Sequence, residues 1–127
     1  NSFMVSADMA HGLHPNHPDK HDPVNRPIIN AGPVIKIEGN QKYTTDSNSC
    51  AVFEMICKEN SIPYQKFVNR SDMIGGSTLG NVSAGQLAIR SVDVGNSMWA
   101  MHSVRETSGV DDHTFMTNAL KGFYNAE

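Results

Sequence analysis

Five prolines in the first third of the sequence place the strongest constraint on how this chain folds. They are Pro15, Pro18, Pro23, Pro27 and Pro33. Each proline removes a backbone donor and disfavours helix at the residue before it, so the segment from about 12 to 33 is predicted to be irregular. A loop of this length inside a compact domain is uncommon and usually serves a function.

On both sides of this loop, strand-like and helix-like patterns alternate, which is typical of an α/β protein. Apolar or alternating runs predict strands at residues 2–7, 33–39, 64–69 and 91–95. Helical periodicity predicts helices at 47–60, from the glycines at 75–80 to about Arg90, and around 116–123. The 127 residues have the length of one domain.

Alternation within two of the strands predicts which side chains face the core. In "PVIKIEG", Ile35 and Ile37 share one face, and Lys36 shares the other face with Glu38. In "SVDVG", the two valines are predicted to point inward and Asp93 outward.

The helix at 47–60 has an N-cap candidate among residues 46–48 and an apolar stripe formed by Val52, Met55 and Ile56. This stripe is expected to face the sheet.

Composition and charge exclude several classes of protein. A formal charge of −3 and a pI near 6.0 provide no electrostatic basis for binding nucleic acid. No apolar run is long enough for a membrane helix, and a cytoplasmic location is expected. Cys50 and Cys57 would lie about 10 Å apart on one helix, whereas a disulfide needs Cα atoms within about 7 Å. Both are therefore expected to be free, with Cys57 as a packing residue.

Histidines in the proline-rich loop suggest a metal site at first sight. His11, His14 and His17 follow an H-x-x-H-x-x-H spacing, and His21 comes soon after. Prolines exclude a regular helix here, and in an extended chain the first three would scatter over about 20 Å. The helical zinc signature, two histidines at i and i+4 with a glutamate between, is absent. Two interpretations stay open: a solvated loop, or one or two members of a site completed elsewhere.

Two residues outside that histidine run are better ligand candidates. Asp8 follows an apolar strand, and sites in α/β proteins gather at the carboxyl ends of strands. Its alternative role is a helix N-cap or a turn. His102 lies in "AMHSVRE", where Arg105 and Glu106 are possible partners for its ring, and its alternative role is structural.

The glycine-rich stretch "GGSTLG" at 75–80 leaves an anion-binding function open, although it lacks the lysine of a phosphate-binding loop. A small metal-binding module and an anion-binding α/β module are thus the alternatives to an enzyme.

Four stretches in order, "SADMAHGLHPNHPDKH", "RPIINAGPVIKI", "GGSTLG" and "AMHSVRE", resemble the aspartyl aminopeptidase family of zinc metallopeptidases. The resemblance runs from Val5 to about Phe123. It implies two zinc ions bridged by an aspartate, with Asp8 as a terminal ligand of one and His102 of the other. It also implies that His14 reaches a neighbouring subunit's active site and that the 75–80 loop lines the cleft.

The resemblance further implies that Lys36 neutralises the acidic side chain of an N-terminal Asp or Glu substrate residue. Residues 1–127 would be the C-terminal part of a catalytic domain with a mixed sheet flanked by helices, in a dodecamer-like homo-oligomer. The general base, the bridging aspartate and the other ligands would lie upstream, and the family's inserted oligomerisation domain would not be among these residues. The isolated chain is therefore expected to be inactive. His11, His17, His21 and His113 have no assigned role.

Overall fold

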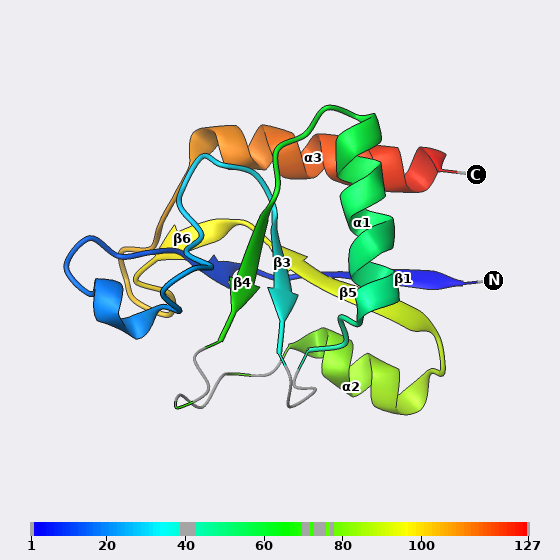
Figure 1. Ribbon diagram of the computed structural model, residues 1–127, viewed down its shortest axis with the longest axis horizontal. Helices are drawn as coiled ribbons and strands as arrows, with labels where there is room; N and C mark the ends of the chain where they lie inside the picture. Colours follow the sequence, from blue (N-terminus) through cyan, green and yellow to red (C-terminus); the bar gives the residue numbers. More distant parts are fainter. Residues whose placement is uncertain (1, 39–42, 70–71, 73–75, 77, 127) are drawn as a thin grey trace.

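A four-stranded mixed sheet forms the centre of the chain in the computed structural model, which describes residues 2–38, 43–69, 72, 76 and 78–126 (Figure 1). Its strand order is β1-β5-β3-β4. The outer pairs β1–β5 and β3–β4 are parallel, and the central pair β3–β5 is antiparallel. The strands span Phe3–Ala7 (β1), Val34–Ile37 (β3), Gln65–Val68 (β4) and Arg90–Gly95 (β5). The four predicted strands are thus confirmed.

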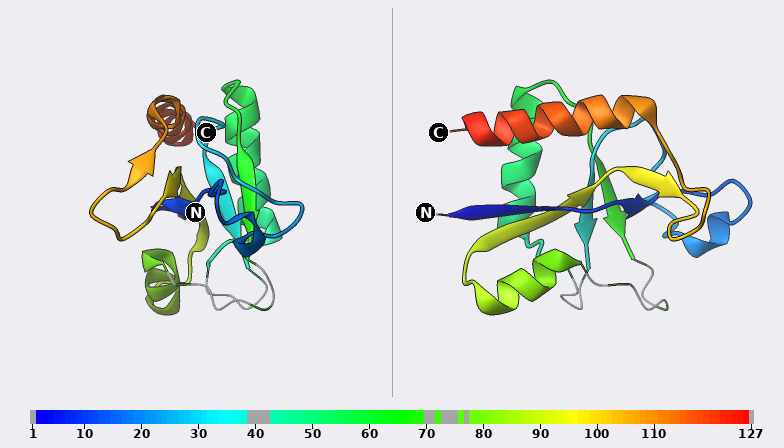
Figure 2. Two further views of the ribbon diagram at one scale, coloured as in Figure 1. Left: turned by 90° about the vertical axis from the view of Figure 1, so that its left-hand side faces the viewer. Right: turned by 180° about the vertical axis from the view of Figure 1, so that it is seen from behind.

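A second, smaller sheet continues from the ends of β1 and β5. It consists of β2 (Ala10–His11), β6 (Ser97–Trp99) and β7 (Thr107–Ser108), in the order β2-β6-β7. These strands have only two or three residues, too few to show a period in the sequence, so they were not predicted. The loop before β3, with a short 3-10 turn at Pro18–Lys20, lies at the same end of the molecule as β6 (Figure 2).

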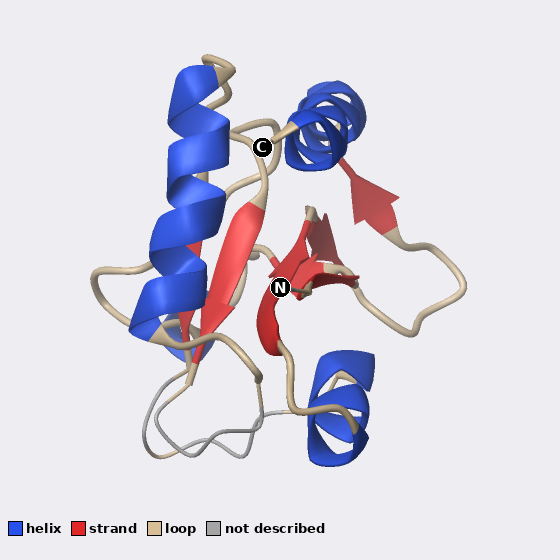
Figure 3. Cartoon of the chain, turned by 90° about the vertical axis from the view of Figure 1, so that its right-hand side faces the viewer, coloured by secondary structure: helices blue, strands red, loops and turns tan. Residues whose placement is uncertain are grey.

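Helices cover both faces of the main sheet (Figure 3). The helices α1 (Ser47–Glu59) and α3 (Val110–Asn125) pack on one face, and α2 (Leu79–Gln86) lies against β5 and β1 on the other. The helix predicted after the glycines at 75–80 corresponds to α2. Its predicted end near Arg90 is wrong, because Leu87 is already extended and Arg90 begins β5. No helix in the described part of the chain is long and apolar enough to span a membrane.

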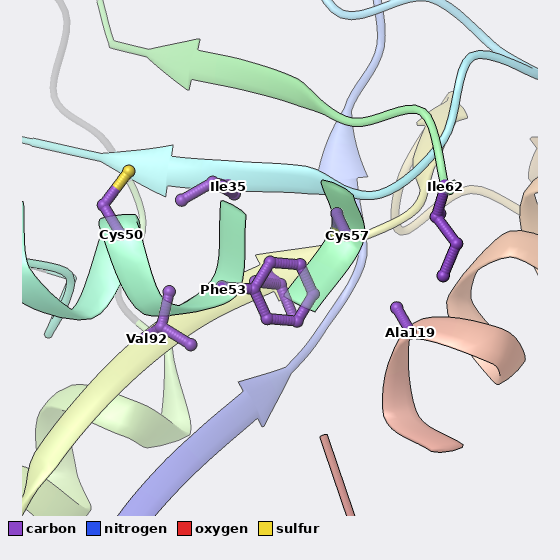
Figure 4. Close-up of a cluster of buried hydrophobic side chains, with 8 residues drawn as sticks. Ile35, Cys50, Phe53, Cys57, Ile62, Val92 and Ala119 are labelled. Carbon is purple, nitrogen blue, oxygen red and sulfur yellow. The ribbon is translucent and has the colours of Figure 1, made fainter. Parts of the chain in front are cut away.

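The buried face of α1 differs from the predicted stripe. Met55 is 54% exposed, whereas Ile56 is buried together with three residues outside the stripe. These three are Cys50, Phe53 and Cys57, which belong to the core cluster (Figure 4). The stripe was misplaced because apolar side chains occupy more than one face of this helix, and the cysteines and Phe53 fill the space against β3 and β5. Both cysteines are free, as expected.

The N-terminus of α1 is capped as predicted. The Asp46 carboxylate accepts a hydrogen bond from the Ser49 N–H at 2.6 Å, and the Ser49 hydroxyl accepts from the Asp46 N–H at 2.9 Å. This capping box satisfies two backbone donors at the helix start.

The second face of the sheet is polar and buried, which corrects one prediction. Asp93 is fully buried rather than outward-facing, because α2 covers this side of β5. Lys36 faces away from Ile35 as predicted, yet it is only 4% exposed. Alternation correctly separated the two faces, but the sequence did not show that both are covered.

Glu54 on α1 makes stability depend on pH in acid. Its hydrogen bond with Lys66 at 2.7 Å, supported by donors from Tyr64 and Cys50, lowers the pKa of Glu54 from 4.5 to about 2. Because the folded-state pKa lies below the unfolded value, the stabilisation is complete above about pH 4.5 and is lost as pH falls toward about 2. We expect Glu54→Gln to remove about 1 kcal/mol near neutral pH, allowing for the partial exposure of Lys66, and to flatten this acid limb.

Urea unfolding of the wild-type and Glu54→Gln proteins across this pH window checks the prediction. Glu59→Gln, an exposed glutamate on the same helix, is the matched control. Equal acid dependence of the wild-type and Glu54→Gln proteins would contradict it.

Candidate metal-binding cleft

Asp8 lies directly after β1, at the junction between the two sheets. Its N–H donates to the Val94 carbonyl oxygen at 2.9 Å, which continues the pairing of β1 with β5. Gly95 faces the Asp8 carbonyl so closely that a Cβ at this position would overlap it. The next element is β2, so the helix N-cap alternative for Asp8 is excluded. Its exposed carboxylate is available to a ligand.

His102 lies in the turn between β6 and β7, in a backbone conformation that few residues adopt. Its φ is 70°, and that of Ala100 is 54°. Non-glycine residues with positive φ are uncommon and cluster at functional sites. The Glu106 side chain accepts a hydrogen bond from the His102 N–H at 2.7 Å, so it holds the backbone here rather than the ring.

Asp8, His102 and Lys36 line one cavity of about 110 Å³. The predicted ligands and the predicted substrate-binding lysine, which come from three different parts of the sequence, therefore share one cleft. The ammonium of Lys36 lies 5.8 Å from the centre of the Tyr43 ring, which is a cation–π arrangement. The other lining residues are Met9, Ala10, His11, Tyr43, Phe67, Gly76, Thr78 and Met101.

Burial and charge act against each other in this cleft. Burial lowers the pKa of Lys36, while the nearby carboxylates of Asp8 and Asp93 favour its charged form. Burial also lowers the pKa of His11, and the neighbouring side chains of His21, Lys36 and His102 lower it further. The cleft therefore favours a neutral imidazole at His11, which is the form that binds metals.

His14 does not line this cavity. It lines an adjoining hollow of about 400 Å³, which shares His11, Tyr43, Phe67, Gly76 and Met101 with the cleft. The His14 ring lies 5.6 Å from that of His17 and 5.7 Å from that of Trp99, measured between ring centres.

The loop brings its histidines closer together than an extended chain would. His11, His14, His17 and His21 all line the adjoining hollow, because the His17 N–H donates to the His14 carbonyl and the 3-10 turn at Pro18–Lys20 folds the loop back. The His21 ring is buried, with Nε2 at 3.2 Å from the His11 carbonyl oxygen. Among the described residues, no group of three or more His, Cys, Asp or Glu side chains is arranged to hold a metal.

Of the glycine-rich stretch at 75–80, Gly76 and Thr78 line the cleft, while residues 75 and 77 lie outside the described residues. Thr78 precedes α2 but does not cap it with its side chain; its hydroxyl donates to Asp93 instead. This hydroxyl is therefore committed within the protein, which reduces the support for an anion site here.

The donors in the cleft suit zinc in kind but not in number. Carboxylate and imidazole are both common zinc ligands, and Asp8 and His102 supply one of each. A catalytic zinc needs about three protein ligands. These residues therefore fit a zinc site only together with further ligands that the described part of the chain does not supply.

The mixed α/β fold and a cleft with a carboxylate, an imidazole and a buried lysine define a candidate part of a metallohydrolase. Residues 1–124 match the family model described as aminopeptidase I zinc metalloprotease (M18). The chain belongs to this M18 family.

Relatives in this family are much longer than the chain. It is 56% identical over 125 residues to a probable M18 family aminopeptidase 2 of Clostridium acetobutylicum, covering 98% of this chain and 29% of that protein. A chain in a cryo-EM structure of the Ape4 and Nbr1 complex superposes with a TM-score of 0.94 at 39% identity, over 96% of this chain and 23% of that one. The dodecamer of S. cerevisiae mApe1 superposes with a TM-score of 0.86 at 28% identity, over 98% of this chain and 27% of its own.

Proposed function

We propose that this chain is the C-terminal part of the catalytic domain of a dinuclear zinc aminopeptidase that removes N-terminal Asp or Glu from peptides. The observation that carries the proposal is the convergence of Asp8, His102 and Lys36 on one cleft in a member of the M18 family. The general base and the remaining ligands would come from outside these 127 residues.

Asp8 and His102 would each hold one zinc ion in the longer protein. When bound, zinc supplies a water molecule of lowered pKa and a Lewis acid for the peptide carbonyl. Asp8 is suited to this role because the pairing of β1 with β5 fixes the backbone on which it sits. His102 is held by the turn that Glu106 closes.

Lys36 would bind the acidic side chain of the substrate's first residue. An ammonium in a buried setting forms a stronger charge-assisted contact with a carboxylate than an exposed one does. We further propose a dodecamer-like assembly in which His14 reaches the active site of a neighbouring subunit; the dodecameric state of yeast mApe1 supports it. The two free cysteines support a cytoplasmic location.

Replacing Lys36 tests the substrate assignment. We expect Lys36→Met in the full-length protein to lower kcat/KM about 100-fold for peptides with N-terminal Asp and less than about 3-fold for peptides with N-terminal Ala, because only the former needs the ammonium. Lys121→Met, which alters an exposed lysine on α3, is the matched control and should change neither value. Equal losses for both substrates would remove Lys36 from this role.

A further inference from the structure

Asp93 lies in the middle of β5 and is fully buried, yet its carboxylate is well supplied with donors. One oxygen accepts from the Thr44 N–H at 2.7 Å and from the Thr44 hydroxyl at 3.1 Å. The other oxygen accepts from the Thr78 hydroxyl at 2.7 Å. The Asp93 N–H donates in turn to the Thr45 hydroxyl at 2.9 Å. A buried carboxylate with several donors is a strong local anchor, because breaking any of these bonds leaves a buried polar group unpaired.

The anchored segments form two walls of the cleft, although Asp93 itself does not line it. Tyr43 precedes Thr44 directly and contributes its ring to the cavity lining. Thr78 lines the cavity at the start of α2. One buried side chain therefore holds two cleft walls that are 34 residues apart in the sequence.

The wall formed by Tyr43 is also the one that contacts Lys36. The Lys36 ammonium lies 5.8 Å from the Tyr43 ring centre, and no described carboxylate forms an ion pair with it. The strands place Lys36 near Asp93 as well. The antiparallel pairing of β3 with β5 ends at Ile35 and Val94, and one step further Lys36 and Asp93 face each other on the same side of the sheet.

We propose that Asp93 is a positioning residue for the acidic-substrate pocket: through Thr44 it fixes the Tyr43 ring against the Lys36 ammonium, and through the Thr78 hydroxyl it fixes the part of the cleft that Thr78 lines. This inference rests on the proposed function of Lys36. A displaced wall lets the ammonium move within the cleft, so the contact with the substrate's carboxylate is lost while contacts with a neutral first residue are largely kept.

The test compares selectivity, defined as the ratio of kcat/KM for N-terminal Asp to that for N-terminal Ala, in the full-length protein. We expect Asp93→Ala to lower this ratio about tenfold or more. Asp93→Asn should restore it to within about 1.5-fold of wild type, because the amide oxygen can accept from the Thr44 N–H while the Thr78 hydroxyl turns to accept from the amide nitrogen. If Asp93 only stabilised the fold, Asp93→Ala would lower kcat/KM for both substrates alike. A loss confined to the N-terminal Asp substrate in Asp93→Ala, together with its recovery in Asp93→Asn, therefore indicates a positioning role.

Asp112→Ala is the matched control, since Asp112 is equally buried but accepts its hydrogen bonds from the loop before β3, away from the cleft. It should leave the ratio unchanged. A folded Asp93→Ala protein with the wild-type ratio would overturn the inference. So would equal losses in Asp93→Ala and Asp93→Asn for both substrates.

Thr44→Val decides the case if Asp93→Ala does not fold, because it removes one hydroxyl at nearly constant volume. A ratio lowered about threefold would support the positioning role, and an unchanged ratio would overturn it. The same measurements distinguish a wrong assignment of Lys36 from a wrong assignment of Asp93. If Lys36→Met leaves the ratio unchanged, the proposed role of Lys36 is wrong; if Lys36→Met lowers it but Asp93→Ala and Thr44→Val do not, only the role of Asp93 is wrong.

Discussion

Replacing His102 with Ala in the full-length protein should reduce aminopeptidase activity at least about 1,000-fold and lower the zinc content of the purified protein. The cleft supplies one imidazole at this position, and an alanine there leaves a zinc ion with too few protein ligands to be retained. The left-handed backbone at His102 shows that the fold holds this residue in a restricted conformation at the cleft. Zinc analysis alongside a peptide-hydrolysis assay measures both effects.

His113→Ala is the matched control, since it removes an exposed histidine from the first turns of α3 and should keep both zinc and activity. The isolated 127-residue chain extends the same test. We expect it to hydrolyse Asp-peptides no faster than its own His102→Ala variant, because Asp8 and His102 alone do not complete a zinc site. Full activity in the full-length His102→Ala variant would contradict the proposed role of His102. An isolated wild-type chain faster than its His102→Ala variant would contradict the expected inactivity of the 127 residues alone.

Local sequence patterns were sufficient to predict the strands of the main sheet and the start of α1. β1, β3, β4 and β5 were predicted because apolar runs or period-two alternation mark them, and the capping residue of α1 was visible in the sequence. The burial of Asp93 and Lys36 was not visible. Asp93 is covered because α2, which is separated from β5 only by residues 87–89, packs back over β5, and alternation within a strand does not report on which face the preceding helix packs.

The candidate site shows the same division between local and distant information. Asp8 was a ligand candidate because it follows a strand, and His102 because it stands between apolar and polar residues. Both had structural alternatives, and only the family resemblance favoured the ligand role for each. Tyr43 was missed because it stands in no motif; its place in the cleft depends on the bonds from Thr44 to Asp93. The histidine loop was predicted to be irregular, which is correct, but the turn that gathers its rings depends on contacts with Trp99 and Phe67 from other segments.

Replacing Asp112 with Ala should lower the free energy of unfolding by about 3–5 kcal/mol, a larger loss than the one expected for Glu54→Gln. Asp112 lies in the first turn of α3 and is fully buried. Its carboxylate accepts from the Asn30 N–H at 2.7 Å and from the Gly32 N–H at 2.8 Å. Alanine leaves the buried Gly32 N–H and the part-buried Asn30 N–H without these acceptors, and it removes a negative charge from a helix start that has no side-chain cap.

Asp112→Asn separates the contributions of the two hydrogen bonds that Asp112 accepts. It keeps one acceptor, but it turns an amide N–H group toward the second donor. We expect about half of the loss seen in Asp112→Ala, measured as the shift in the urea unfolding midpoint. Asp111→Ala is the matched control, since its exposed side chain stands on the same turn and should change stability by less than about 0.5 kcal/mol. Asp112→Ala within about 1 kcal/mol of wild type would show that the loop before β3 satisfies its own donors. The predicted loss instead implies that the Asp112 carboxylate on α3 holds residues 30–32 in place.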